Sequence, residues 1–349
     1  MADRIAGTGD RWVAAVLVAA AAAFHLAGLA RVAAPNLYWF DESIYTYSAV
    51  IANTGQTPYR DFCYVHPPGL LWLDQGVLAL GGGVYGLRLV WWSLGAVVLA
   101  QTYQLAARAY GGGEGPSQTA GGLAALLVAS SSVFQELAVQ NVAHLAMPAL
   151  GFVLLKLLAR PTGTRPWAAG LVVVAMSLFR LQAVYFVPAA VAYVWLEHGL
   201  RAGWRPSAKF AAAGAVGAAA LHGGLACAYP GYVENVVRFQ MLRPSTDVWG
   251  RFAVLHTQMQ DWPFVVGLLA AAALGGGPGG RGVAGYAVAG VAALAAGSRY
   301  FAGLYLIAFT PALAALAGRW VARSARGSGG VLAAAGVVAL FQAVELFPK

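Results

Sequence analysis

The feature that most constrains this chain is a series of long apolar stretches separated by short turns rich in Gly, Pro and Arg. A hydrocarbon core about 30 Å thick needs about 20 apolar residues in a helix to cross it. The series predicts an all-α polytopic integral membrane protein, a single transmembrane domain over 1–349 with about 11 transmembrane helices, in a range of about 9–13. The stretches on either side of Arg180 fall short of a full span and could be half-buried helices or one broken pair. The stretches lie at roughly 12–33, 84–106, 119–138, 142–159, 166–179, 183–196, 210–228, 263–275, 283–298, 301–318 and 330–346.

The composition excludes an ordinary water-soluble fold. The chain is 60% hydrophobic and 10% charged, whereas a soluble domain has about 25% charged residues. Its formal net charge of +9 does not indicate nucleic-acid binding, because the Lys and Arg residues are scattered between apolar stretches and form no basic segment with interleaved aromatics. Cys63 and Cys227 are its only cysteines. They can build neither a disulfide framework nor a CxxC metal site, and a bond between the two stays open.

The N-terminus and the loop charges predict the orientation. A lead with Arg4 and Arg11 precedes an apolar run at 12–30. Because this run is longer than the about 7–15 apolar residues of a cleavable signal, we interpret it as the first span and keep cleavage as the alternative. With the N-terminus in the cytoplasm, most Lys and Arg fall in inner loops and most Asp and Glu fall outside, as the positive-inside rule requires. We therefore expect a multi-pass plasma-membrane protein whose long loops, 34–83 and 229–262, are extracytoplasmic.

The first outer loop carries two adjacent carboxylates, Asp41 and Glu42, directly after the aromatic run Leu37-Tyr38-Trp39-Phe40. Aromatic girdles lie at the membrane–water interface, so the carboxylates are expected near the membrane surface. Apolar residues recur at helical spacing up to Gly55, which predicts a short interfacial helix over 43–54 with Asp41 at its N-terminus. Two interpretations of Asp41 stay open. It caps this helix, or one of the two carboxylates is a general base in a cleft that a substrate hydroxyl can reach.

Two prolines begin a second apolar segment in the same loop. The run His66-Pro67-Pro68-Gly69 is followed by an apolar stretch at 70–80, whose helical length of about 16 Å is too short to cross a membrane. We therefore expect a second interfacial helix that starts at the prolines. His66 is either a hydrogen-bonded structural residue or a participant in catalysis, and the sequence leaves both interpretations open.

The loop as a whole forms one pattern: Asp41-Glu42, Gly55, Pro58-Tyr59, Asp61, His66-Pro67-Pro68-Gly69 and then Gly86-Leu87-Arg88-Leu89. This pattern resembles the first-loop signature of the GT-C membrane glycosyltransferases, in the branch of the protein O-mannosyltransferases and lipid A aminoarabinose transferases. Members of that branch are similar in having a first span, a large outer loop with two interfacial helices, and then a bundle of spans. The likeness continues less sharply at 178–182 and 298–300. Unlike many members, this chain is expected to have no soluble C-terminal domain, which leaves recognition of the acceptor unexplained.

The resemblance implies an inverting glycosyltransferase that moves a sugar, a hexose or a pentose, from a polyprenyl-phosphate carrier to a hydroxyl of a glycan, lipid or protein acceptor outside the cytoplasm. Such a reaction needs a base for the acceptor hydroxyl and positive charge for the departing phosphate. Asp41 is the expected base, and Glu42 is its orienting neighbour or an alternative base. Tyr45, Asp61 and His66 are expected to bind the sugar. No cofactor is firmly implied, and a divalent metal, if one is used, would be held by Asp41, Asp61 or His66.

Five outer-side arginines are the candidates for binding the phosphate: Arg180, Arg238, Arg243, Arg251 and Arg299, the last with Tyr300 beside it. Arg180 and Arg299 adjoin apolar spans, where an unpaired charge is costly and usually marks function. The alternative is that each arginine pairs with a buried carboxylate or extends along apolar surface to the interface. We favour Arg299, helped by Arg180 or Arg243, because a guanidinium group can form two charge-assisted bonds to a phosphate.

The competing interpretation is a transporter or flippase of a lipid-linked or small polar substrate, in which the polar residues line a path. Such proteins place ionisable groups near the bilayer midplane. Here the middles of the expected spans are nearly free of acids and bases, and the carboxylates concentrate in the outer loops. The sequence therefore favours glycosyl transfer.

Overall fold

The computed structural model describes residues 2–33, 40–108, 117–259, 262–274, 280–298, 303–325 and 329–336. These ranges contain helices joined by turns, and their only β-type pairing is an isolated bridge between Pro58 and Phe62. The all-helical architecture expected from the apolar stretches is therefore confirmed.

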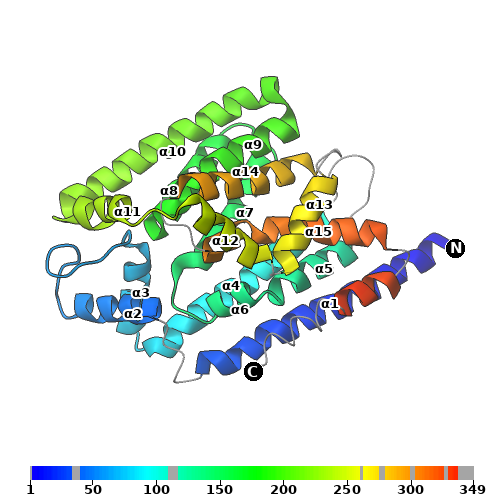
Figure 1. The fold of residues 1–349 in the computed structure, drawn as a ribbon, viewed down its shortest axis with the longest axis horizontal. Helices are drawn as coiled ribbons and strands as arrows, with labels where there is room; N and C mark the ends of the chain where they lie inside the picture. The colour runs from blue at the N-terminus through cyan, green and yellow to red at the C-terminus, as the bar shows by residue number, and fades with distance from the viewer. Residues whose placement is uncertain are drawn as a thin grey trace.

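Among the described residues, three helices are long and apolar enough to cross a membrane: α1 (Ala2–Ala33, over Arg11–Ala33), α4 (Gly83–Ala107) and α10 (Leu200–Ala228). In Figure 1, α1 begins at the right of the molecule and ends at the left, beside α2 (Phe40–Asn53) and α3 (Gly69–Ala79). We call this left side the α2–α3 end of the bundle. The other side, where α9 turns into α10, is the opposite end.

Shorter helices complete the bundle around the three long ones. They contain from 6 residues in α6 to 17 in α14, and short 3-10 segments adjoin several of them. Non-helical backbone at membrane depth is tolerated where it is buried in protein. The elements are α5 (Gln118–Ala129), α6 (Ser132–Leu137), η1 (Ala143–Leu145), α7 (Ala146–Leu158), α8 (Arg165–Phe179), η2 (Leu181–Tyr185), α9 (Phe186–His198), α12 (Val248–Met259), α13 (Trp262–Leu274), α14 (Arg281–Gly297), η4 (Gly303–Ala308) and α15 (Thr310–Ser324).

Several of the expected span boundaries differ from the helices of the structure. The stretch 119–138 is not one helix, because the chain breaks at Ser130 and Ser131, and the Ser131 hydroxyl accepts a hydrogen bond from the Phe134 N–H at 3.3 Å to start α6. The stretch expected at 210–228 begins ten residues earlier, at Leu200, since Pro206 lies early in α10 and does not break it. The last stretch, 330–346, is helical over 329–336, and the rest of it lies outside the described residues.

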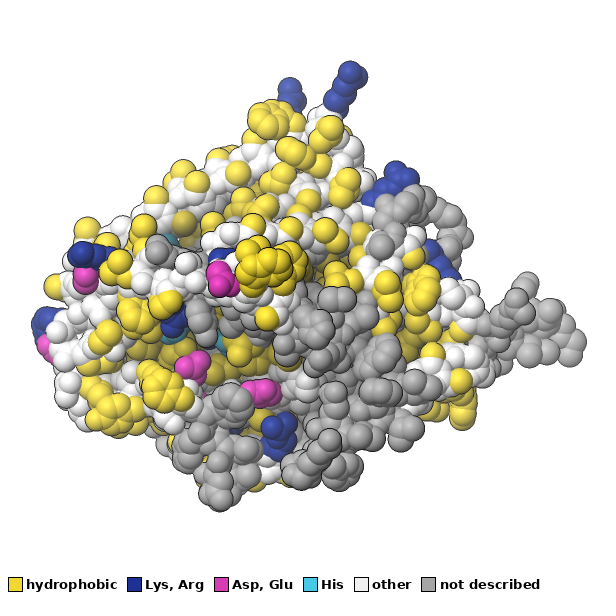
Figure 2. All heavy atoms as spheres, in the orientation of Figure 1, with side chains coloured by type: hydrophobic (Ala, Val, Ile, Leu, Met, Phe, Trp, Pro, Cys, Tyr) yellow, Lys and Arg dark blue, Asp and Glu magenta, His cyan; other side chains and the backbone are white. Residues whose placement is uncertain are grey.

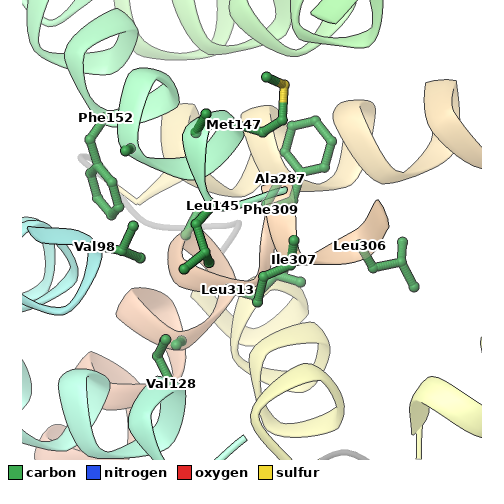
Figure 3. Close-up of a cluster of buried hydrophobic side chains, with 14 of the residues drawn as sticks. Val98, Val128, Leu145, Met147, Phe152, Ala287, Leu306, Ile307, Phe309 and Leu313 are labelled. Atoms are coloured by element: carbon green, nitrogen blue, oxygen red, sulfur yellow. The ribbon is translucent and has the colours of Figure 1, made fainter. Parts of the chain in front are cut away.

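The bundle core is built from aliphatic and aromatic side chains of many helices. Figure 3 shows Val98 of α4, Val128 of α5 and Leu313 of α15 in one buried cluster with Leu145 and Phe309. Helix α5 lies at the centre, because its residues from Thr119 to Ala129 are all buried. Small residues allow close helix approach in membranes, so the Ala- and Gly-rich composition serves packing.

The loop that the sequence predicts to be extracytoplasmic contains, over 40–83, the two short helices expected from the sequence. The helix expected over 43–54 is α2, Phe40–Asn53, so Asp41 and Glu42 lie within its first turn and not before it. The helix expected over 70–80 is α3, which starts at Gly69. Exposed apolar residues at helical spacing, Phe40, Ile44, Tyr47 and Val50, form one face of α2, as in a helix that lies along a membrane surface.

The topology can be tested at Gln56, an exposed residue just after α2. In a chain whose exposed, unbonded Cys63 and Cys227 are replaced by Ser, Gln56→Cys should react with a membrane-impermeant maleimide added outside the cell. The matched control is Ala202→Cys, an exposed position at the opposite end, which should react only after the membrane is opened. The reverse pattern would show that the predicted orientation is inverted.

Candidate active site

The two adjacent carboxylates of α2 have opposite environments. Acidic residues are favourable in the first turn of a helix because they complement its dipole. Successive helical residues point in different directions, so one of a neighbouring pair can face solvent while the other faces the protein. Here Asp41 is exposed, and Glu42 is completely buried.

Glu42 forms a bidentate ion pair with Arg88 of α4. The Arg88 Nε and Nη2 atoms donate to the Glu42 Oε1 and Oε2 atoms at 2.9 and 2.8 Å, and both side chains are about 1% exposed or less. Arg88 also donates to the carbonyl oxygen of Val32, near the end of α1, at 3.3 Å. One pair therefore ties together α1, α2 and α4 directly beneath Asp41.

Asn141 extends this ion pair into a buried polar network. Its backbone N–H donates to Glu42 Oε1 at 3.1 Å, and its side-chain amide donates to Asp74 Oδ2 at 2.7 Å. Its side-chain oxygen accepts from the Trp91 indole at 2.7 Å. The turn between α6 and η1 is thereby joined to α2, α3 and α4, so the first outer loop is fixed against the bundle at several points.

Asp74 completes the network as a second buried carboxyl group. Burial raises its pKa to about 7, with the neighbouring Glu42 acting in the same direction and the hydrogen bond from Asn141 acting against them. A raised pKa means that near neutral pH a large fraction of Asp74 is uncharged. Arg88, the cation of this network, therefore does not have to balance two full negative charges.

Tyr45, one helical turn after Asp41, links the exposed carboxylate to the interior. Its hydroxyl lies 2.9 Å from His66 Nε2 and is hydrogen-bonded to Arg180. Burial raises the Tyr45 pKa; the charge of Arg180 lowers it and that of Asp41 raises it. Asp41 and Arg180 therefore both act on one phenol, although they are far apart in sequence.

His66 is a neutral, buried imidazole beside this phenol. Burial holds its pKa well below the usual range, and the positive charges of Arg180 and Arg243 lower it further. The Tyr59 hydroxyl donates to the His66 carbonyl oxygen at 2.8 Å, which fixes the turn before α3. Both interpretations of His66 are compatible with this geometry, because the ring is hydrogen-bonded and also lies beside two guanidinium groups.

Arg180 is a buried cation without a carboxylate partner among the described residues. It ends α8 in an extended conformation and is 4% exposed. The described ion pairs do not include it, and its Nε has no hydrogen-bond partner in the same ranges. Its guanidinium carbon lies 6.0 Å from the centre of the Tyr305 ring. A buried charge of this kind is costly, so the site favours an anion.

A cavity of about 400 Å³ lies beside this arginine. Gln182, Tyr185, Arg243, Ser298 and Tyr305 are among the residues that line it. A smaller hollow lined by Arg180 and His144 shares its Gln182, Tyr185 and Tyr305 walls. Two arginines from different parts of the chain thus border adjoining spaces at the α2–α3 end.

The other predicted site residues are less central or lie outside the described ranges. Asp61 is exposed, accepts from Arg60 at 2.8 Å and from the Thr57 N–H at 2.7 Å, and has its pKa lowered to about 2, first by the Arg60 bond. It stabilises a surface turn. Arg243 stacks on Phe239 at 5.3 Å while lining the cavity. Arg299 and Tyr300 fall outside the described residues.

The metal-binding hypothesis finds no ligand cluster in the part of the chain that the structure describes. No three His, Cys, Asp or Glu side chains lie close enough there to hold an ion together. Asp41, Asp61 and His66 therefore do not form one ligand set, because Asp61 faces its own turn and His66 is buried against Tyr45.

Sequence reasoning missed several residues that build the site. Arg88 lies in the first-loop pattern and Asp74 in the apolar stretch 70–80, but neither is among the site residues predicted from the sequence. A charged residue inside an otherwise apolar helix was the available signal, since such residues usually pair or act in function. Tyr305 and His144 offered no comparable signal.

No family model matches the sequence, and no curated protein matches it. Among solved structures, the crystal structure of ArnT from Cupriavidus metallidurans bound to undecaprenyl phosphate has a TM-score of 0.71 at 17% identity, over 94% of this chain and 63% of that chain. The Archaeoglobus fulgidus oligosaccharyltransferase, in complex with zinc and sulfate, covers 96% of this chain and 51% of its own at 13% identity, with a TM-score of 0.49. This chain thus spans less than two thirds of the length of either structure. The likeness to ArnT shows that this chain shares that protein's fold, which agrees with the membrane helix bundle expected from the sequence.

The buried ion pair predicts a large effect of a small substitution. Glu42→Gln keeps the shape of the side chain but leaves the Arg88 charge buried without its partner, which should cost about 3–5 kcal/mol of unfolding free energy. The control is Glu234→Gln, which breaks an exposed pair with Arg238 and should cost less than about 0.5 kcal/mol. Chemical unfolding in mixed micelles measures both. Equal effects of the two substitutions would contradict a stabilising role for the buried pair.

Proposed function

We propose that this chain, which has the GT-C fold, transfers a sugar from a polyprenyl-phosphate carrier in the membrane to a hydroxyl of an acceptor, on the extracytoplasmic side and with inversion at the anomeric carbon. The observation that carries the proposal is the placement of an exposed carboxylate, Asp41, and a buried arginine without a carboxylate partner in the described residues, Arg180, around one phenol, Tyr45. The acceptor hydroxyl would approach Asp41, and the carrier phosphate would bind Arg180.

Asp41 is suited to be the base because it is reachable and firmly held. Its side chain is exposed in the first turn of α2, and the following residue anchors that turn through the Glu42–Arg88 pair. Both Glu42 oxygens accept hydrogen bonds in the interior. Glu42 therefore serves as the orienting neighbour, and Asp41 is the carboxylate that an acceptor hydroxyl can approach.

Arg180 and Arg243 supply the positive charge for the phosphate. A carrier phosphate would provide the anion that the buried Arg180 lacks among the described residues, and its lipid tail would remain in the membrane. The bound undecaprenyl phosphate of ArnT, a protein with the same fold, supports a ligand of this class. Arg299 keeps its proposed role in phosphate binding, and Tyr300 its proposed role in substrate binding, on the sequence argument alone.

The reaction balances with these groups alone. The acceptor hydroxyl gives its proton to the Asp41 carboxylate while its oxygen forms a bond to the anomeric carbon. The bond between that carbon and the phosphate oxygen breaks, and the electron pair leaves with the carrier phosphate, where a guanidinium group stabilises the developing charge. Attack and departure on opposite faces of the sugar invert the configuration. Tyr45 and His66 are hydrogen-bonded to each other and would lie between the Asp41 carboxylate and the Arg180 guanidinium group.

A transporter or flippase would use the same residues to line a path. The charged residues of the site that the structure describes belong to α2, α3, the start of α4, the end of α8 and position 243, all at one end of the bundle. A transport path would need ionisable groups near the bilayer midplane. Glycosyl transfer therefore explains the arrangement better.

The base assignment predicts the effect of Asp41→Asn. The amide keeps the size of the side chain but cannot accept the hydroxyl proton, so sugar transfer from a radiolabelled polyprenyl-phosphate donor should fall by about 10²–10⁴-fold. Glu234→Gln, which removes another exposed carboxylate from the second outer loop, should retain activity. If Asp41→Asn keeps more than about a tenth of the rate, Asp41 is not the base. If Asp41→Asn still moves a lipid-linked substrate across the membrane at the wild-type rate, the flippase interpretation would be favoured.

The phosphate assignment predicts that Arg180→Lys is not conservative. Lysine keeps the charge but loses the planar fork that can grip two phosphate oxygens. Donor use, measured as kcat/KM for the lipid-linked sugar, should fall about tenfold or more. The control is Arg238→Lys, in an exposed pair, which should change kcat/KM less than about twofold. An unchanged kcat/KM in Arg180→Lys would remove this residue from phosphate binding.

A further inference from the structure

A second and larger cavity lies far from the candidate active site. Its volume is about 920 Å³, and it opens between the ends of α4, α7 and α9 and the start of α8. Along α4, Gln101 in its wall is 13 residues beyond Arg88, a helical distance of about 20 Å. The cavity is therefore at the opposite end of the bundle, on the side that the loop charges predict to be cytoplasmic.

The mouth of this cavity is basic. Four cations line it, Arg108, Lys156, Arg160 and Arg165, against a single carboxylate, Glu197. None of the four belongs to an ion pair of the described residues. Figure 2 shows the same asymmetry on the face in view: among the coloured side chains, Lys and Arg occur at the upper right without Asp or Glu beside them.

The inner wall of the cavity offers hydrogen-bond acceptors. Gln101 Oε1 and Glu197 Oε2 are buried and have no hydrogen-bond partner within the described ranges. Buried acceptors without partners are costly, and each is more stable with a donor. Tyr193 lines the same cavity.

The walls are fixed by polar contacts, so the cavity is preformed. His198 Nε2 lies 3.1 Å from the Leu158 carbonyl oxygen and joins the ends of α9 and α7. Arg319 of α15 donates to the carbonyl oxygens of Ala106 and Arg108 and holds the end of α4. A rigid cavity of this size is typical of ligand sites.

We propose that this cavity binds a phosphate ester whose neighbouring groups are hydrogen-bond donors, supplied by the headgroup of an anionic glycerophospholipid such as phosphatidylglycerol. The cations would contact the phosphate, and Gln101 and Glu197 would accept from the hydroxyls of the headgroup. The membrane is the favoured source because basic pockets between transmembrane helices on the cytoplasmic side bind anionic headgroups. The apolar side chains of Phe152 and Leu155 in the wall would contact the acyl chains. This site is independent of the proposed glycosyl transfer.

Native mass spectrometry of the full chain, purified and stripped of lipid, tests the proposal. The probes are phosphatidylglycerol, phosphatidylcholine and glycerol 3-phosphate. The first variant is Lys156→Gln with Arg160→Gln, both exposed residues of the cavity mouth. The matched control is Arg201→Gln with Arg205→Gln, which removes the same charge from exposed positions at the same end, outside the cavity lining.

The cavity site predicts that phosphatidylglycerol binds about tenfold or more tightly than phosphatidylcholine, that the first variant loses about tenfold or more of this affinity, and that the control loses less than about threefold. Gln101→Leu, which changes no charge, should weaken phosphatidylglycerol binding and leave phosphatidylcholine unaffected. Equal losses in the mouth variant and the control, or none in either, would overturn the site. Displacement of the lipid by glycerol 3-phosphate at similar concentrations would retain a phosphate-ester site and overturn the membrane as its source.

Discussion

The buried pair between Glu42 and Arg88 is the interaction on which the rest of the candidate site depends. The segment that contains α2 and α3 buries Tyr45, Tyr59 and Tyr64 in ring contacts with one another, and the ion pair adds a specific attachment of α2 to the bundle. A charged pair withdrawn from water is stable only when its remaining hydrogen-bonding groups are satisfied, and Asn141 and the Val32 carbonyl oxygen satisfy them here. The attachment fixes the first turn of α2, and with it the direction in which Asp41 faces.

The buried charges around this ion pair differ in whether they are compensated. Glu42 is neutralised by Arg88, and Asp74 is partly neutralised by its own raised pKa. Arg180 has no such compensation among the described residues, and the neighbouring His66 is kept uncharged by burial and by the arginines beside it. The α2–α3 end therefore holds positive charge in its interior and an exposed carboxylate at its rim. An enzyme that separates a phosphate from a sugar requires these two features together.

Most of the fold followed from the length of the apolar stretches, because a helix of known rise must match a membrane of known thickness. The same argument placed α2 and α3 correctly within a few residues, since neither stretch could cross. It failed at Ser130 and Ser131, where a serine cap ends one helix and begins another without loss of hydrophobicity. The sequence singled out Asp41 and Arg180, whose roles stay predictions. It did not indicate the pairing of Glu42 with Arg88 over 46 positions, because local patterns carry no information on contacts between distant helices.

The central claim is that the interior of the α2–α3 end receives a lipid-linked phosphate while Asp41 faces the acceptor. The most direct measurement is a structure of the protein with a polyprenyl phosphate bound, determined by electron cryo-microscopy in a lipid nanodisc. The account predicts the phosphate within about 4 Å of the Arg180 guanidinium group, the distance of an ion pair, in the cavity shared with Tyr305 and Arg243. A phosphate held elsewhere, with Arg180 still in contact only with Tyr45 and Tyr305, would contradict it.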